Sequence, residues 1–308
     1  MKSDEGDQAK ALAVAVAAMP SDAEVALISA GRGVFSHVFR VWSEDRSVVV
    51  KLPRSGPNGV VARSSGAYER ERLAYRRLLS PDLPVPHCHG IVDVESGPAF
   101  VLEDLTQFES VDQLEGLRPT QAMAIVDAII RCHAELSVPL ATELGVRTNT
   151  PHGFDPNTLA VGATLVPATE VFQKVLAERQ HRIDEFGSLD SPVVCHGDPR
   201  ADNLVVGPEV KLFDWQQISI QAGEADLAWL AATSMEPRIR RSCEIDLVER
   251  YAVRTSRSFD HTWSRYQAAM IVPALAVLLL VQRRTEGRLR QLVDVSAQRI
   301  AAAVSDHL

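Results

Sequence analysis

The stretch "HGDPRADN", from His196 to Asn203, gathers two aspartates, an arginine and an asparagine into eight residues. A second short polar stretch, "LFDWQ", follows at Leu212 to Gln216. The proline and glycine of the first stretch argue against a regular helix, and the apolar runs "PVVC" and "NLVV" on either side of it are typical of buried strands. The polar side chains are therefore predicted to lie in a loop between strands, where a rigid scaffold usually presents reactive groups; a simple capped turn is the alternative.

The composition is that of an ordinary globular protein. With 308 residues, 46% hydrophobic and 23% charged, the chain is long enough for one large domain or two lobes, and it is too apolar to be disordered. The net charge of -8 and the pI of about 5.6 provide no basic footprint for nucleic acid. We therefore expect no nucleic-acid partner.

The cysteines and apolar runs indicate a cytoplasmic protein with no membrane partner. The 4 cysteines are far apart and form no C-x-x-C pair, so neither a zinc site nor a disulfide framework is expected. Acidic residues precede the first apolar run, where a signal peptide would carry basic ones, and we predict an amphipathic helix there. The run from Ala268 to Val281 is shorter than the roughly 20 residues of a membrane span and contains Pro273, so it is predicted to be a buried core helix.

The pattern of the chain predicts an α+β protein with two lobes. From Val25 to about Leu105, β-branched runs indicate strands, with a hairpin at "WSEDR" and one helix at "SGAYERERLAYRRLL". Helical patterns dominate from Pro119 onward, except around the two polar stretches. We predict a small β-rich N-terminal lobe with an N-terminal helix, residues 1–105, and a larger α-helical lobe, residues 106–308. The small residues of the segment 56–66 predict a mobile loop.

Residues that could act together in phosphoryl transfer occur in order along the chain. Transfer from a nucleotide needs a backbone that covers the phosphates, a cation that holds them, a carboxylate that fixes the cation, oxygen ligands for magnesium, and an aspartate that orients the attacking hydroxyl. The residues that match these parts are Gly31 and Gly33, Lys51, Glu71, Asp198, Asn203 and Asp214.

These motifs resemble those of the aminoglycoside phosphotransferase and choline kinase-like superfamily. The resemblance rests on "VFSHVFRVW", "VVVKLP", "YERERLAYRRL", "FVLEDL", "CHGDPRADNLVV", "VKLFDWQ" and "ADLAWL", which together look most like the bacterial version of the ecdysteroid-kinase-like branch. The similarity spans about 28–251. H-G-D-x-x-x-x-N has the aspartate-to-asparagine spacing of the protein-kinase H-R-D-x-x-x-x-N motif. The resemblance implies a bilobal protein-kinase-like fold, with a nucleotide-binding N-terminal lobe and with the catalytic loop and substrate pocket in the C-terminal lobe.

The resemblance also implies roles for the residues of the two polar stretches. Asp198 would be the catalytic aspartate, and Asn203 and Asp214 would ligate Mg²⁺. Asparagine and aspartate are both common in turns, but two such oxygen ligands flanking one hairpin favour a metal. Asp226 would support the catalytic loop by hydrogen bonds.

In the first lobe, the resemblance implies a cation that holds the nucleotide. Lys51 ends an apolar strand, where a lysine needs a partner, and an anion contact is favoured over a solvated edge position. Both Glu69 and Glu71 could pair with it, and the family pattern favours Glu71. Glu69 would then belong to a solvated helix face.

The loop expected to cover the phosphates departs from the protein-kinase pattern. "GRGVFS" has Ser36 where the third glycine of G-x-G-x-x-G would stand, so Gly33 and a hydroxyl or amide of Ser36 are predicted to contact phosphate. Glu103 to Leu105 would contact adenine through backbone groups. His196 is predicted to form structural hydrogen bonds, and His133 is predicted to be a packing residue with one hydrogen bond. Arg200 could contact the phosphoryl group or lie on the surface.

The sequence therefore predicts an ATP- and Mg²⁺-dependent kinase that phosphorylates a hydroxyl of a small molecule. An aminoglycoside-like or other antibiotic is the first acceptor class, and a choline-like, sugar or steroid and lipid alcohol is the second. A nucleotide-binding pseudokinase is a further alternative, although the catalytic and metal positions are complete. A protein kinase is disfavoured by "HGD" and "FDW" in place of H-R-D and D-F-G.

Overall fold

The chain folds into two compact units in a computed structural model. The structure describes residues 2–28, 35–148, 155–166, 168–187, 191–283 and 287–308. The first unit comprises Met1–Glu109 and Phe213–Gln217, and the second comprises Ser110–Leu212 and Ile218–Leu308. The short segment Phe213–Gln217, which the sequence assigns to the larger lobe, therefore belongs to the first unit.

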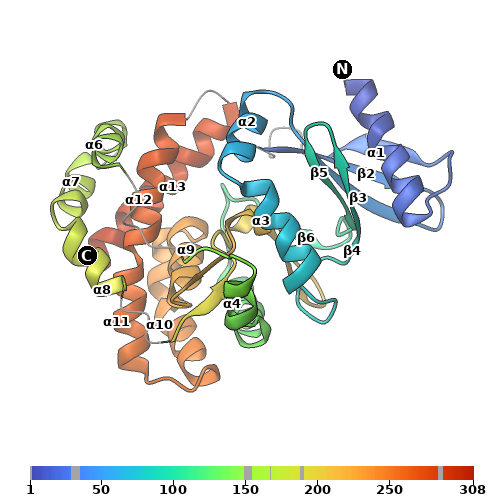
Figure 1. Cartoon of the computed structure of the whole chain (residues 1–308). Coiled ribbons are helices and arrows are strands. Elements are labelled where there is room, and N and C mark those ends of the chain that lie inside the picture. Colours follow the sequence, from blue (N-terminus) through green and yellow to red (C-terminus); the bar gives the residue numbers. More distant parts are fainter. Residues whose placement is uncertain (1, 29–34, 149–154, 167, 188–190, 284–286) are drawn as a thin grey trace. The chain divides into compact units, whose positions relative to one another are not determined.

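A five-stranded antiparallel sheet forms the centre of the first unit (Figure 1). Its spatial order is β1-β2-β3-β5-β4. The hairpin predicted at "WSEDR" is confirmed, since β2 and β3 pair from Ser36 opposite Pro53 to Trp42 opposite Ser47. The strands are β1 (Glu24–Leu27), β2 (Ser36–Trp42), β3 (Ser47–Pro53), β4 (Cys88–Val94) and β5 (Gly97–Glu103).

Two helices cover opposite faces of this sheet. Helix α1 (Lys2–Ala17) buries Ala9 and Ala13, one helical turn apart, against a cluster that includes Val48 and Val50 of β3. Because side chains alternate along a strand, Lys51 points to the other face. That face carries α3 (Ala67–Leu73) and the π-helical turn η1 (Ala74–Leu78) that continues it.

The mobile loop predicted for the segment 56–66 is wrong. Pro57–Ser64 forms helix α2, which begins with Pro57 at the first helical position, where the absent N–H is tolerated. Gly59 is buried in it, and a Cβ there would lie 1.6 Å from the Arg54 carbonyl oxygen. Close packing therefore accounts for Gly59.

The second unit is mainly helical, as the sequence predicts. Around a core that includes Leu230, Leu275 and Leu278, its helices are α4 (Pro119–Glu135), α5 (Val138–Glu143), α6 (Pro156–Leu165), α7 (Thr169–Ala177), α8 (Arg179–Gly187), α9 (Glu224–Ser234), α10 (Pro237–Arg254), α11 (Phe259–Ala269), α12 (Ile271–Leu280) and α13 (Gly287–His307). Short 3₁₀ turns are η3 (Ala201–Asn203) and η5 (Val281–Arg283).

Short strands interrupt these helices where the sequence predicts them. β7 (Val193–Cys195) pairs with β10 (Ser219–Gln221), and β8 (Leu204–Val206) forms a hairpin with β9 (Val210–Leu212). Strand β6 (Glu109–Ser110) spans the boundary of the two units. The loop between β7 and β8 is the "HGDPRADN" stretch.

By length and composition alone, the segment Phe259–Leu280 could cross a membrane. It comprises helices α11 and α12, and 67% of its most apolar window is buried. A core helix passes the same test, so this segment is weak evidence for a membrane span.

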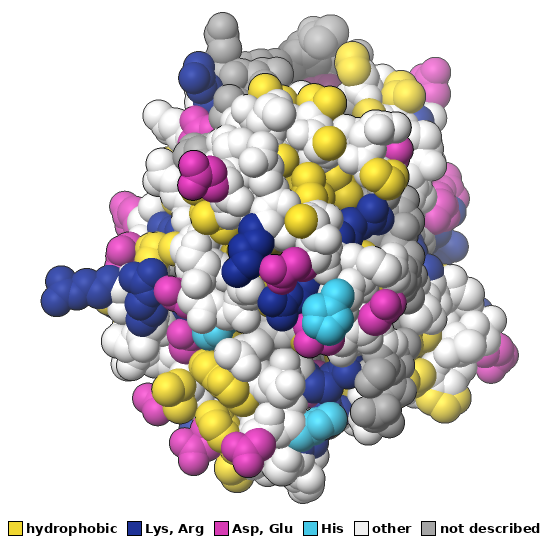
Figure 2. Space-filling view, turned by 90° about the vertical axis from the view of Figure 1, so that its left-hand side faces the viewer, with side chains coloured by type: hydrophobic (Ala, Val, Ile, Leu, Met, Phe, Trp, Pro, Cys, Tyr) yellow, Lys and Arg dark blue, Asp and Glu magenta, His cyan; other side chains and the backbone are white. Residues whose placement is uncertain are grey.

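On the face shown in Figure 2, acidic and basic side chains are interspersed with apolar ones.

Candidate active site

Lys51 of β3 lies between two carboxylates of the first unit. Its Nζ donates to Glu71 Oε1 at 2.7 Å and Oε2 at 2.8 Å, and to Asp214 Oδ1 at 2.7 Å. Burial lowers the pKa of Lys51, but Asp214 and Glu71 outweigh burial and raise it overall. Lys51 is therefore a fixed cation, suited to an anion such as a phosphate group.

The structure selects Glu71 over Glu69 as the partner of Lys51. Glu71 is fully buried, whereas the side chain of Glu69 is 66% exposed and pairs with Arg72 at 3.4 Å. Burial raises the pKa of Glu71, and the charge of Lys51 opposes this shift. The glutamate thus depends on the lysine to stay ionised.

Gln216 is a further member of this cluster that the sequence analysis did not single out. It lies in η4 (Trp215–Gln217), where its Nε2 donates to Glu71 Oε2 at 3.3 Å and its carbonyl accepts from Arg70 Nε at 2.7 Å. These two contacts tie η4 to helix α3. The presence of Gln216 directly after "FDW" was the only sequence signal for it.

Asp214 has a backbone conformation that few residues adopt. Its φ is +66°, in the left-handed region, which aspartate tolerates better than most non-glycine residues. Such strain tends to occur at functional sites, where the surroundings hold it in place. The contact with Lys51 is one such constraint.

The predicted phosphate-covering loop is described only in part. Gly33 lies outside the described residues. Ser36 begins β2 and is 4% exposed, and its side chain hydrogen-bonds with Tyr68. The Tyr68 hydroxyl also donates to the Phe35 carbonyl and accepts from the Arg54 amide. The Ser36 hydroxyl thus has a protein partner, and a phosphate contact by its amide or hydroxyl stays a prediction.

The predicted adenine-contacting segment follows β5. Glu103 ends the strand, and its Oε2 accepts from the His87 amide at 3.0 Å, while Leu105 is half-buried. Between them, the side chain of Asp104 accepts from Arg40 Nε at 2.7 Å and from the Thr106 amide at 2.8 Å, two contacts that the sequence did not predict. These bonds fix the backbone of the segment.

The loop of the second unit presents Asp198. Gly197 has a φ of +83°, which glycine adopts without strain, and this accounts for the glycine before the aspartate. Asn203 ends η3 and donates from Nδ2 to the Asp198 carbonyl at 2.9 Å and to Asp198 Oδ2 at 3.0 Å. Arg200 Nε lies 3.6 Å from Asp198 Oδ2. The spacing of five residues thus brings Asn203 onto Asp198.

The donor chemistry of Asn203 and Asp214 fits Mg²⁺. Magnesium prefers oxygen ligands, and both residues carry them. The two hydrogen bonds from Asn203 to Asp198 use its NH₂ group, so the amide oxygen is the atom suited to a metal. Both residues of the predicted metal pair therefore carry an oxygen suited to the ion.

Asp226 of α9 holds the start of the loop, as the resemblance implies. Its Oδ2 accepts from the His196 amide at 2.8 Å and its Oδ1 from the Gly197 amide at 2.9 Å. His196 is also structural, as predicted, because its Nδ1 accepts from the Asp198 amide at 3.2 Å. Burial raises the pKa of Asp226, but hydrogen bonds, His133 first among them, lower it overall.

The prediction that His133 forms one hydrogen bond is wrong, because its side chain forms two. Its Nε2 lies 3.1 Å from Asp226 Oδ2 and its Nδ1 3.0 Å from the Tyr251 hydroxyl. Both partners come from helices that the periodicity of the sequence could not place next to His133. A metal could fit by distance between His133, Cys195 and Asp226. However, burial raises the pKa of the Cys195 thiol well above its usual value, which disfavours the thiolate that binds metals. The Asp226 oxygens are also engaged, because they accept backbone N–H groups.

Asp226→Asn is expected to destabilise the protein by about 3 kcal/mol, because it removes a buried charge from a hydrogen-bonded cluster. Because the pKa of Asp226 is lowered in the folded state, its ionised form stabilises the fold at every pH above the ordinary aspartate pKa. This stabilisation is lost as the pH falls through the lowered pKa. Urea unfolding at pH 7 measures the loss. The exposed Asp246→Asn is the control, and equal stability of both variants would contradict the role of Asp226.

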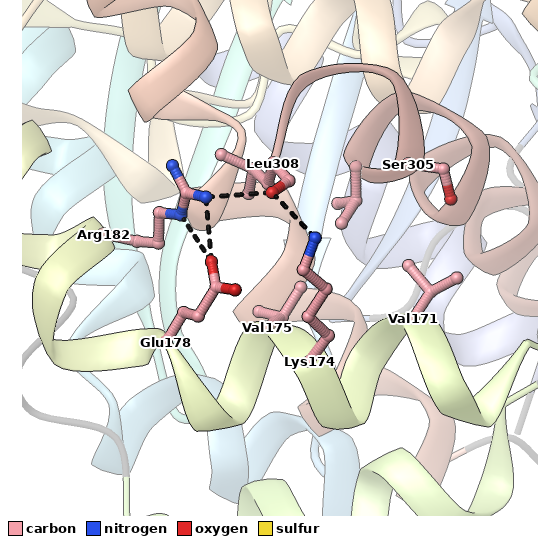
Figure 3. Close-up of a pocket in the computed structure, with 8 residues that line it drawn as sticks. Val171, Lys174, Val175, Glu178, Arg182, Ser305 and Leu308 are labelled. Atoms are coloured by element: carbon pink, nitrogen blue, oxygen red, sulfur yellow. Dashed lines mark hydrogen bonds and ion pairs between the residues drawn. The ribbon is translucent and has the colours of Figure 1, made fainter.

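A pocket of about 200 Å³ lies elsewhere in the second unit (Figure 3). It is lined by α7, α8 and the end of α13 and contains none of the predicted site residues. Its basic groups already have partners: Lys174 and Arg182 donate to the Leu308 carbonyl oxygen at 3.4 and 2.9 Å, and Arg182 also pairs with Glu178 at 2.8 Å. We do not assign it to the reaction.

Comparisons with known proteins concern the family and the fold of the chain. The model of a family described as the phosphotransferase enzyme family matches residues 27–267, and none of the curated proteins matches significantly by sequence. A microcompartment-associated aminopropanol kinase shares the fold with a TM-score of 0.61 at 14% identity, over 98% of this chain and 95% of that chain. A spectinomycin phosphotransferase solved with ADP and spectinomycin has a TM-score of 0.55 at 16% identity, over 97% of each chain.

A choline kinase from Streptococcus pneumoniae is similar over 99% of each chain, with a TM-score of 0.54 at 14% identity. At these identities the likeness establishes the fold. The α+β, bilobal, kinase-like fold predicted from the sequence is therefore confirmed.

Proposed function

We propose that this chain, which belongs to the phosphotransferase enzyme family and is a small-molecule kinase, transfers the γ-phosphoryl group of ATP to a hydroxyl of a small amine-bearing alcohol. The observation that carries the proposal is the arrangement around Lys51. Two carboxylates, Glu71 and Asp214, fix its ammonium group within 2.8 Å, as is needed for a cation that holds phosphate groups.

Each predicted site residue has its own part in the proposed reaction. Lys51, braced by Glu71, would hold the α- and β-phosphates. Asn203 and Asp214 would hold Mg²⁺, which when bound neutralises charge on the phosphates. Asp198 would accept the hydrogen bond of the acceptor hydroxyl and orient its oxygen for direct in-line attack. Asp214 contacts Lys51 through Oδ1 in this structure, so the same carboxylate would serve both the lysine and the ion.

The acceptor class is inferred from what the similar proteins share. Their names specify spectinomycin, choline, aminopropanol, ethanolamine and hygromycin B, and each of these compounds combines a hydroxyl with an amino or ammonium group. The net charge of -8 suits a cationic acceptor. An antibiotic of this kind is the first candidate, and a metabolic amino alcohol is the second.

An acceptor screen tests the proposal. We expect Mg²⁺-dependent ATP turnover with at least one of the five named compounds, abolished by EDTA, and none with a matched pool of neutral sugars and sterols. Turnover with the neutral pool alone would overturn the acceptor class. No turnover together with no binding of Mg²⁺-ATP in calorimetry would overturn the kinase reaction itself.

A further inference from the structure

One face of helix α9 contacts the loop 196–203 at three points. Asp226 accepts the backbone amides of residues 196 and 197, as described above. At the far end of the helix, Ser234 Oγ accepts from the Ala201 amide at 2.9 Å. Between them, Trp229 follows Asp226 by three residues, a spacing that places both side chains on the same side of a helix.

Trp229 contacts the side chain of Asp198. Its indole Nε1 donates to Asp198 Oδ1 at 2.7 Å, while Asn203 Nδ2 donates to Oδ2 at 3.0 Å. Each carboxylate oxygen thus has its own N–H donor, one from a helix and one from the loop. With a hydrogen bond on each oxygen, the plane of the carboxylate is fixed. A single hydrogen bond would leave the carboxylate free to rotate.

The indole suits this role for two physical reasons. Its N–H is a donor with no acceptor function, so it favours the ionised, acceptor-only form of Asp198. Its ring is rigid, and the half-buried Trp229 sits on a helix whose neighbouring residues Leu227, Ala228 and Leu230 are buried. The donor is therefore held in place before a substrate arrives.

We propose that Trp229 is a positioning residue, which through its indole N–H aims the Asp198 carboxylate at the acceptor hydroxyl. The inference rests on the proposed function, in which Asp198 orients that hydroxyl. Asp226 and Ser234 hold the backbone of the loop, whereas Trp229 acts on the one side chain expected to touch the reacting group. Packing alone is the alternative role for a tryptophan on this helix.

Two substitutions separate the N–H from the bulk of the ring. Trp229→Phe keeps an aromatic ring but removes the donor. Trp229→His removes the fused ring, while its Nε2 occupies the place of the indole Nε1 in a five-membered ring. We expect Trp229→Phe to lower kcat by about 10- to 100-fold, the loss of one hydrogen bond to a charged group, with little change in the KM for ATP. Trp229→His, assayed at about pH 8 where the ring is neutral, should retain more kcat than Trp229→Phe.

The acceptor for these assays is whichever of spectinomycin, hygromycin B, choline, ethanolamine and aminopropanol gives the highest turnover. Trp263→Phe is the matched control, because Trp263 of α11 is also half-buried and stacks on Phe259 and Tyr266. A kcat for Trp229→Phe equal to that of the control, or higher than that of Trp229→His, would overturn the positioning role.

A second measurement does not depend on activity. The chain has 4 tryptophans, so ¹⁵N-labelled indole groups give few resonances, and Trp229→Phe identifies one of them. Asp198→Ala should shift that resonance and speed its exchange with solvent; an unchanged resonance would overturn the contact. A wild-type protein inactive with all five acceptors would instead count against the proposed function, and the resonance would still decide the contact.

Discussion

Asp198→Asn is expected to lower kcat by about 100- to 10,000-fold, the range for loss of a positioned acid–base group. The substitution keeps the size of the side chain but replaces one acceptor oxygen by an NH₂ donor. That donor would face either Trp229 Nε1 or Asn203 Nδ2, both of which are donors themselves. The orientation of the side chain is thus lost together with its charge. The KM for ATP should change little, because Asp198 is proposed to act on the acceptor. Steady-state kinetics with the acceptor found in the screen measures both parameters.

Asp202→Asn provides the control from the same loop. Asp202 accepts from the Gln113 amide at 3.3 Å and lies four residues after Asp198. The chemical change is identical, but no role in the reaction is proposed for this residue, and we expect kcat within about threefold of the wild-type value. Equal losses in the two variants would mean that the loop needs its charge or its fold rather than a catalytic aspartate at position 198.

Most of the fold could be predicted from the sequence because the residue patterns and the motifs indicated the same helices and strands. The β-branched run in "SVVVKLP" predicts a strand, and the structure shows Val48 and Val50 on one face and Lys51 on the other. The prediction of a loop at 56–66 was wrong because small residues, which are common in loops, also occur where two parts of the backbone pack closely. At Gly59 the Arg54 carbonyl leaves no room for a side chain, and this neighbour is visible only after folding.

The candidate site was predictable where residues lie close together in sequence. Asp198 and Asn203 are separated by a motif spacing, and their hydrogen bond follows from one turn of the loop. Gln216 and Trp229 carry no such signal, because each contacts a residue distant in sequence: Glu71, 145 residues away, and Asp198, 31 residues away. Long-range contacts of this kind depend on the packing of helices, which periodicity alone does not orient.

Lys51→Met should lower kcat/KM by roughly 100- to 1,000-fold, as expected when one preorganised charge at a phosphoryl group is removed. The methionine fills the same space on β3 but leaves Glu71 and Asp214 without the cation between them. The loss should appear largely in the affinity for nucleotide, because Lys51 is proposed to hold the α- and β-phosphates. Calorimetric titration with Mg²⁺-ATP measures it. Unchanged nucleotide affinity would contradict the phosphate role of Lys51.

The same substitution should alter stability in a pH-dependent way. Removing one partner of a buried ion pair costs about 3 kcal/mol, since Glu71 is left as an uncompensated buried charge. Burial already raises the pKa of Glu71 against the opposing charge of Lys51, and without Lys51 the pKa must rise further. A carboxyl with a raised folded-state pKa contributes its full stability below the ordinary glutamate pKa and loses it as the pH rises towards the raised value. The destabilisation by Lys51→Met should therefore be small near about pH 5 and grow towards about pH 8.

The control for this pH dependence is Lys211→Met. Lys211 is also a buried strand lysine, on β9, and pairs with Glu209 at 2.7 Å, but the Glu209 side chain is 50% exposed and can return to water when the lysine is lost. Its stability loss should be smaller and nearly independent of pH between about 5 and 8. Urea unfolding curves of both variants across this range make the comparison. A flat profile for Lys51→Met would show that Glu71 does not rely on Lys51 to remain ionised, and the lysine would then be braced by Asp214 alone.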